Sequence, residues 1–176
     1  ILRGVRCAVY HFQGHMKHIY AAYQTLFLVG RIDMLHMALK GFLKQKTKFP
    51  FEIVIYDDAS TDRTPDIIQE YARRCPEKIR PWLSEENQYS RGVTNPSGAF
   101  NFPRARGKYI AMCEGDDYWT DSEKLQRQVD YLESHPGCSL CIHSARILTV
   151  DGSHSDRRMR PCRRSRRISS RQVIDK

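Results

Sequence analysis

The sequence contains no apolar stretch long enough to cross a membrane. A spanning helix needs about 18 consecutive residues with few or no charges, and the most apolar run, residues 21–30, is too short. The chain also begins without Met and shows no short apolar core followed by small residues, which is the pattern of a secretory signal peptide. We therefore expect no membrane insertion and interpret the chain as a fragment or a processed product.

Cysteine is scarce and scattered, with 6 cysteines among 176 residues. Small disulfide scaffolds are far denser, so this usage favours a reducing, cytoplasmic location. Cys138, Cys141 and His143 could supply part of a zinc site. A closed zinc site needs four ligands, however, and a strand would place the two cysteines on opposite faces. Buried thiols are the preferred interpretation.

Acidic residues are nearly absent from the end of the chain, which carries most of the net charge. The formal net charge of the chain is +9. Residues 152–176 hold nine Lys and Arg against two Asp, so this segment contributes +7 of that net charge. We expect this segment to be a disordered, basic tail. Its guanidinium groups could pair with phosphate, but without interleaved aromatic residues it has no means of reading a nucleic-acid sequence, so no specific nucleic acid is expected.

Strand-like and helix-like segments alternate between residues 31 and 151. Residues 51–56 form a β-branched run that stops at two Asp, and Thr64 with Pro65 then provides a helix start. Further strands are expected at 79–83, 108–113 and 138–150, and further helices at about 32–44 and 122–134. This alternation predicts an α/β fold, with a Rossmann-like, mostly parallel sheet flanked by helices.

Two acidic clusters each follow directly on a predicted strand. They are Asp-Asp-Ala-Ser-Thr-Asp at 57–62 and Glu-Gly-Asp-Asp at 114–117. Ordinary turn chemistry explains either cluster alone, but ligands of open α/β sheets bind beyond the carboxyl ends of the strands, where both clusters would face one cavity. Gathered carboxylates repel one another unless a cation joins them, and Mg²⁺ or Mn²⁺ prefers oxygen ligands together with substrate phosphates. The pattern favours a metal and a phosphate-bearing ligand.

Four segments match the motifs of a known enzyme family in order and spacing. They are residues 41–47, 51–64, 107–119 and 124–130. In these segments the chain resembles the family 2 glycosyltransferases, which use nucleotide sugars and have the GT-A fold. The resemblance covers roughly residues 37–142. It implies metal-dependent, inverting transfer of a sugar from a nucleotide-diphosphate donor to a glycan or lipid-linked acceptor, in the cytoplasm or at the inner face of the membrane, with peripheral membrane association.

The resemblance also assigns roles to single residues. Asp57, Asp58 and Asp116 would bind the nucleotide sugar, and Asp117 with Asp116 would hold Mg²⁺ or Mn²⁺. Tyr118 and Trp119 could stack on a sugar or close the loop over the next helix. No segment after residue 150 resembles the part that carries the family's catalytic base, so the base is unassigned and we expect a GT-A fold that is incomplete at the acceptor side.

The start of the chain departs from the family pattern. The family's first strand normally ends in a Tyr-Asn turn that touches the base, whereas residues 28–31 read Leu-Val-Gly-Arg. We therefore divide the chain into an atypical N-terminal segment, 1–30, a nucleotide-sugar-binding α/β domain, 31–151, and the basic tail, 152–176.

Two alternatives to a sugar transferase remain at this point. The first is a non-enzymatic, phosphate-binding module that acts through the Arg-rich tail and whose acidic clusters are only turns. The second is a phospho-accepting receiver domain, which also gathers acids at strand ends. A receiver would need a Lys on a later strand, and the only Lys that follows Asp117 closely is Lys124, inside a predicted helix.

Overall fold

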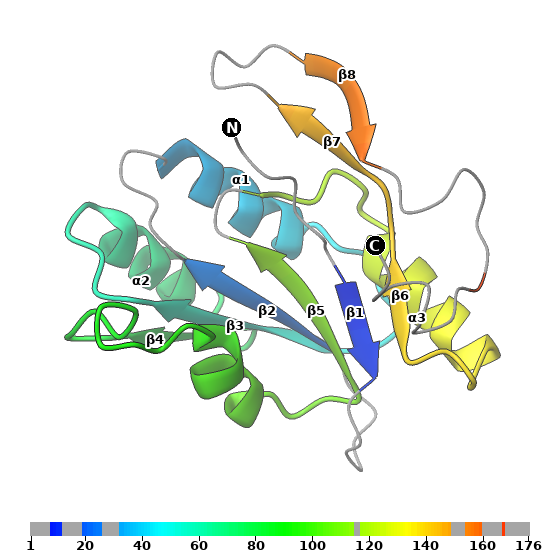
Figure 1. Ribbon diagram of the computed structural model, residues 1–176, viewed down its shortest axis with the longest axis horizontal. Helices are drawn as coiled ribbons and strands as arrows, with labels where there is room; N and C mark the ends of the chain where they lie inside the picture. The colour runs from blue at the N-terminus through cyan, green and yellow to red at the C-terminus, as the bar shows by residue number, and fades with distance from the viewer. Residues whose placement is uncertain are drawn as a thin grey trace.

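A six-stranded sheet with helices around it forms the body of the protein, as the computed structural model in Figure 1 shows. The structure describes residues 8–11, 19–25, 32–114, 117–148, 154–159 and 167, with side-chain surroundings for 32–114, 117–147 and 167. The strand order is β4-β3-β2-β5-β1-β6. The strands are β1 Ala8–His11, β2 Ile19–Thr25, β3 Phe51–Asp57, β4 Ile79–Leu83, β5 Tyr109–Glu114 and β6 Leu140–Ile142.

The sheet is mostly parallel, as the sequence predicts. β2 pairs in parallel with both β3 and β5, and β3 pairs in parallel with β4. β1 runs antiparallel between β5 and β6. All seven residues of β3 are buried, which is typical of an inner parallel strand covered on both faces.

One face of the sheet packs against three helices that begin and end close to where the sequence places them. They are α1 Ile32–Leu43, α2 Thr64–Arg74 and α3 Lys124–Ser134. In α1 the buried residues recur every three or four positions, which gives the helix one apolar face. These residues join the core, together with alternate residues of β3 such as Ile53 and Ile55. The sequence offers Thr64 as an N-cap candidate for α2, but the helix begins at Thr64 itself and its N-cap position is Arg63. The Thr64 N–H donates to Asp62 Oδ1 at 2.9 Å.

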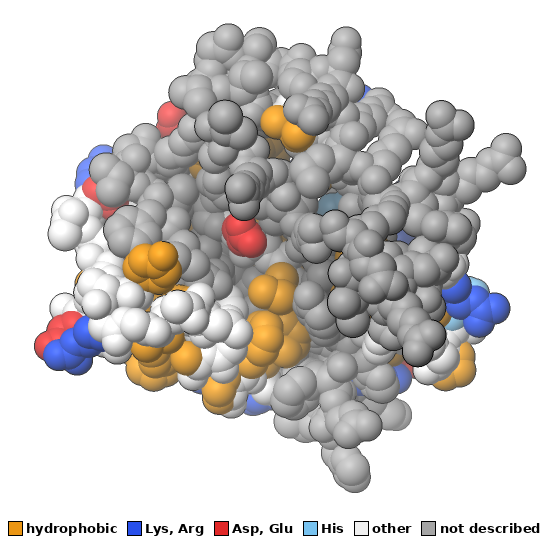
Figure 2. Space-filling model, viewed as in Figure 1, with side chains coloured by type: hydrophobic (Ala, Val, Ile, Leu, Met, Phe, Trp, Pro, Cys, Tyr) orange, Lys and Arg blue, Asp and Glu red, His pale blue; other side chains and the backbone are white. Residues whose placement is uncertain are grey.

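The other face of the sheet carries an aromatic cluster under two short helices, η1 Ser97–Asn101 and η2 Phe102–Arg104. The Tyr56 ring stacks on Phe100 at 4.5 Å between centroids, and Trp82 meets Phe100 edge-on at 5.2 Å. Figure 2 shows apolar side chains gathered on this face, over β4 and the short helices.

The N-terminal part of the structure differs from our division of the chain. We set residues 1–30 apart from the α/β domain, but β2 lies between β3 and β5 near the middle of the sheet, and β1 pairs with β5. The difference has a physical reason. Parallel pairing joins segments that are far apart in the sequence, and no local turn signal marks such partners.

The C-terminal part also differs. In place of one strand over 138–150, the structure has β6 and, after a two-residue break, β7 Ala145–Leu148. β7 pairs antiparallel with β8, His154–Met159, in a separate two-stranded sheet. Residues 154–159 thus form a strand within the segment that we set apart as a basic tail, because a basic composition does not prevent backbone pairing within a hairpin.

The described helices offer no membrane span, since none of them is both long and apolar enough to cross a bilayer.

Candidate active site

The two acidic clusters lie at one edge of the sheet. In the parallel ladders Thr25 pairs with Asp57 and Gln24 pairs with Glu114, so β3 and β5 end at the same level on either side of β2. The arrowheads of these three strands point to the same side in Figure 1. Two strand spacings place the ends of β3 and β5 about 10 Å apart. A ligand the size of a nucleoside diphosphate can span that separation.

Asp57 is buried at the end of β3 and closes the turn that follows. Its Oδ2 accepts the Ser60 N–H at 3.1 Å, and its Oδ1 accepts the Ser60 hydroxyl at 2.5 Å. Ala59, inside this turn, has a φ of 58°, a left-handed conformation that is rare for residues other than glycine. The carboxylate of Asp57 thus fixes the shape of the loop at the carboxyl edge of the sheet.

Asp58 anchors a second loop, the one that follows β4. Its Oδ1 accepts the Tyr56 hydroxyl and the Gln88 N–H, both at 2.7 Å, and its Oδ2 accepts the Tyr89 N–H at 3.0 Å. Burial, and next the hydrogen bond to Asp58, raise the pKa of Tyr56 well above its usual range. Both oxygens of Asp58 therefore contact the protein itself, and the geometry shows a loop-anchoring role. Its contact with a nucleotide stays a prediction.

The second acidic cluster begins with a turn at the end of β5. The Asp117 N–H donates to the Glu114 carbonyl at 3.1 Å, and the Cys113 thiol donates to the Asp117 carbonyl at 3.6 Å. Asp117, half-buried, thus sits beside the end of β5 and offers the hard oxygen donors that Mg²⁺ and Mn²⁺ prefer. Asp116, the other predicted metal ligand, lies outside the described residues, as do residues 28–31, where we located the base-binding turn.

The described residues contain no cluster of three or more metal ligands, either at the acidic turns, where Asp116 is not described, or elsewhere. Within residues 32–114 and 117–147 there is no group of three or more His, Cys, Asp or Glu placed to hold an ion. The zinc half-site considered for Cys138, Cys141 and His143 is therefore not formed. Burial raises the pKa of the Cys141 thiol, as expected for a cysteine in a packed position.

Trp119 belongs to the core, which decides between its two interpretations. The side chain is only 3% exposed, and its ring meets Phe42 of α1 edge-on at 4.6 Å. The Lys124 ammonium lies 4.1 Å from the centre of the same ring. Trp119 therefore closes the acidic loop, here residues 117–123 between β5 and α3, over the helices and does not present a face to a sugar. Tyr118 is partly buried and packs against the same core.

Gly41 in α1 packs directly against the backbone of this loop. A Cβ added to Gly41 would lie 2.7 Å from the Trp119 carbonyl oxygen and 3.2 Å from its backbone nitrogen. Only glycine allows the helix and the loop backbone to approach so closely. Gly41 opens segment 41–47, one of the four segments that match the family motifs, but the sequence of this segment does not indicate which residues Gly41 contacts.

We expect Gly41→Ala to lower the free energy of unfolding by about 2 kcal/mol, because the new methyl group must push backbone atoms apart. Chemical denaturation followed by Trp fluorescence measures this change. Gly137→Ala is the matched control, because an added Cβ there meets nothing within 4 Å. Equal stabilities for the two variants would contradict the close approach.

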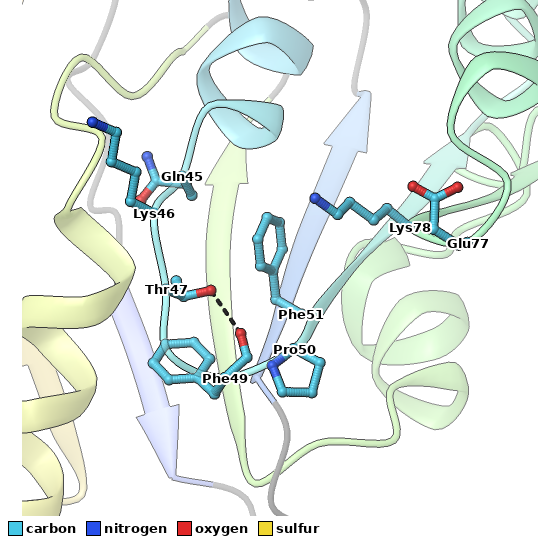
Figure 3. A pocket seen from close by; sticks show the side chains of 8 residues that line it. All are labelled: Gln45, Lys46, Thr47, Phe49, Pro50, Phe51, Glu77 and Lys78. Carbon is cyan, nitrogen blue, oxygen red and sulfur yellow. Dashed lines mark hydrogen bonds between the residues drawn. The ribbon is translucent and has the colours of Figure 1, made fainter.

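A cavity of about 430 Å³ lies at the opposite edge of the sheet. It is formed where the chain enters β3 and β4, and Figure 3 shows Lys78 extending toward the ring of Phe51. The Lys78 ammonium is 5.1 Å from the centre of that ring. Because this cavity lies at the amino ends of the parallel strands, it is separate from the acidic clusters. Its lining residues are Gln45, Lys46, Thr47, Phe49, Pro50, Phe51, Glu77 and Lys78.

The fold and the site together define an α/β protein of the GT-A class. The family model of glycosyl transferase family 2 matches residues 28–174, so the chain belongs to this family. The resemblance inferred from the four segments is thereby confirmed, as is the expected fold class.

Two curated proteins are similar to parts of this chain. The uncharacterized protein Rv1520 of Mycobacterium tuberculosis (strain ATCC 25618 / H37Rv) is 47% identical over 125 residues, which are 69% of this chain and 34% of the relative. The putative teichuronic acid biosynthesis glycosyltransferase TuaG of Bacillus subtilis (strain 168) is 31% identical over 107 residues, which are 61% of this chain and 40% of TuaG. The chain thus spans about a third of the length of the first of these curated relatives.

A solved structure shares the fold. The crystal structure of S. aureus TarS 1–349 in complex with UDP-GlcNAc superposes with a TM-score of 0.53 and 26% sequence identity. The superposition covers 69% of this chain and 32% of that chain.

Proposed function

We propose that this chain forms the donor-binding part of a metal-dependent, inverting glycosyltransferase. The observation that carries the proposal is the parallel register that brings the ends of β3 and β5, and with them both acidic clusters, to one edge of the sheet. Membership of glycosyl transferase family 2 supports it, and so does the fold shared with TarS, which was crystallised with a nucleotide sugar.

In this proposal the two loops built on Asp57 and Asp58 form the wall beside the nucleotide. Their hydrogen bonds hold the loop backbones rigidly, which reduces the ordering cost of binding. Asp117, with Asp116, would hold Mg²⁺ or Mn²⁺ against the diphosphate. When bound, this cation supplies positive charge that neutralises the departing nucleoside diphosphate.

The transfer itself follows the inverting course. A carboxylate takes the proton of an acceptor hydroxyl while that oxygen attacks the anomeric carbon, and the bond from this carbon to the diphosphate oxygen breaks on the opposite side. The acceptor is a glycan or a lipid-linked sugar, and the catalytic base is unassigned. The name of TuaG supports a place in cell-envelope polysaccharide synthesis. We propose a cytoplasmic location, with peripheral association at the inner face of the membrane.

Calorimetry tests the proposal directly. We expect a nucleoside diphosphate to bind to the full chain in the presence of Mn²⁺, and to bind at least about a hundredfold more weakly once EDTA has removed the cation. Truncation before residue 160 keeps β8 and removes most of the basic tail, so binding should survive it. If binding instead disappears with the tail, depends strongly on salt and ignores Mn²⁺, the phosphate-binding module is the better explanation.

A further inference from the structure

Gln45 joins three parts of the structure that meet behind the acidic loop. It follows the last turn of α1, and its side chain is 7% exposed. Its Nε2 donates to the Gly41 carbonyl at 3.1 Å and to the Asp121 carbonyl at 2.7 Å, and its Oε1 accepts the Leu125 N–H at 3.1 Å. These partners fix the orientation of the amide, because a flipped side chain would set its oxygen against two carbonyls.

The contact with Leu125 completes the start of α3. The first N–H groups of a helix have no partner inside the helix, and the N-cap residue Glu123 provides no side-chain cap here. Gln45 therefore caps α3 from the segment that follows α1. The Lys46 N–H adds a second link between the same segments, because it donates to the Ser122 carbonyl at 2.7 Å.

Gly41, near the end of α1, and Gln45, two residues after this helix, hold the acidic loop at two points. Gly41 packs against the backbone of Trp119, and the Gln45 amide donates a hydrogen bond to the carbonyl of Asp121. Asp117 is only two residues before Trp119, and two residues span at most about 7 Å. A shift of the held segment therefore moves the Asp117 carboxylate.

We propose that Gln45 is a positioning residue that sets where Asp117 meets the metal and the diphosphate. This inference rests on the proposed function. Gln45 touches neither donor nor metal and acts through the loop backbone. A misplacement of about 1 Å at a reacting group reduces activity strongly, so the inference predicts a specific change in metal dependence.

The test compares Gln45→Leu with a matched substitution on the same interface, Gln126→Leu. The Gln126 Oε1 accepts the Lys48 N–H at 2.7 Å, so it also ties the connection after α1 to α3, but it does not bind the acidic loop. The Mn²⁺ concentration that half-saturates nucleoside diphosphate binding is measured by calorimetry for both full-length variants. We expect it to rise about tenfold in Gln45→Leu and to stay unchanged in Gln126→Leu, with binding in EDTA equal in both.

Hydrogen exchange provides the second readout. The Leu125 amide and the amides of residues 117–121 should lose protection in Gln45→Leu and keep it in Gln126→Leu. If Gln45→Leu does not fold, Gln45→Glu replaces it, because this variant keeps an acceptor for the Leu125 N–H and loses the donors to the two carbonyls.

Two outcomes would overturn the inference alone: unchanged exchange at these amides, or an equal change in Mn²⁺ dependence in the two variants, while the wild-type chain binds the nucleotide. A wild-type chain that binds no nucleoside diphosphate overturns the proposed function, and the inference with it. The wild-type titration thus separates the two failures.

Discussion

Replacing Asp117 with Ala is expected to weaken Mn²⁺-dependent binding of a nucleoside diphosphate by roughly a hundredfold. A Mg²⁺ or Mn²⁺ site of this kind uses one or two carboxylates together with substrate phosphates, so one substitution removes a large share of the protein ligands. Asp117 is the part of the second acidic cluster that the structure places at the end of β5, through the turn between its N–H and the Glu114 carbonyl. Isothermal calorimetry with and without Mn²⁺ measures the effect.

The control for this variant is Asp66→Ala, which removes an exposed carboxylate from the first turn of α2. It changes the net charge equally and lies outside both acidic clusters, so it should bind the nucleotide as the wild type does. Thermal unfolding shows whether Asp117→Ala is folded. A folded Asp117→Ala with unchanged Mn²⁺ dependence would refute the metal role assigned to this residue.

Asp58→Ala is expected to lower the free energy of unfolding by about 3 kcal/mol. The substitution deprives the Tyr56 hydroxyl and the Gln88 and Tyr89 N–H groups of their acceptor in a buried place. A buried donor left without a partner costs more than the net value of the bond it made, and bonds to a charged acceptor are among the stronger ones. Urea denaturation followed by circular dichroism measures the loss.

Asp58→Asn separates the anchoring of the loop from the charge. The amide oxygen still accepts at the Oδ1 position, whereas the NH₂ group of the new Asn faces the Tyr89 N–H. We therefore expect the free energy of unfolding of Asp58→Asn to lie between those of the wild type and Asp58→Ala. If Asp58→Ala lowers the free energy of unfolding by no more than the exposed control Asp66→Ala does, the loop after β4 does not depend on the Asp58 carboxylate.

The local sequence predicted the elements whose own pattern decides their structure. β4 at 79–83 has the bounds that its apolar run indicates, and α1 differs from the expected helix by one residue at its end. Apolar spacing and the Pro65 signal act within a few residues, so they are readable without knowledge of the partners. The placement of both acidic clusters at strand ends was predictable for the same reason.

The contacts that shape the site could not be predicted in this way. Asp58 binds backbone groups about 30 positions later in the chain, and Gln45 binds Leu125 across 80 positions. No periodicity links such residues, because a loop can approach a strand end or a helix start from any part of the sequence. The aromatic Trp119 could have faced a ligand or the core, and only its packing against Phe42 decided for the core.

The sequence by itself determined the class of fold and the pair of carboxylate-rich turns that end β3 and β5, since both follow from local patterns of apolar and polar residues. The tertiary structure alone decided that β2 lies between those strands, that Asp58 holds the loop after β4, and that Gly41 of α1 and Gln45 just after this helix hold the acidic loop. These features depend on which distant segments bury and hydrogen-bond one another, and that is a property of the packed chain.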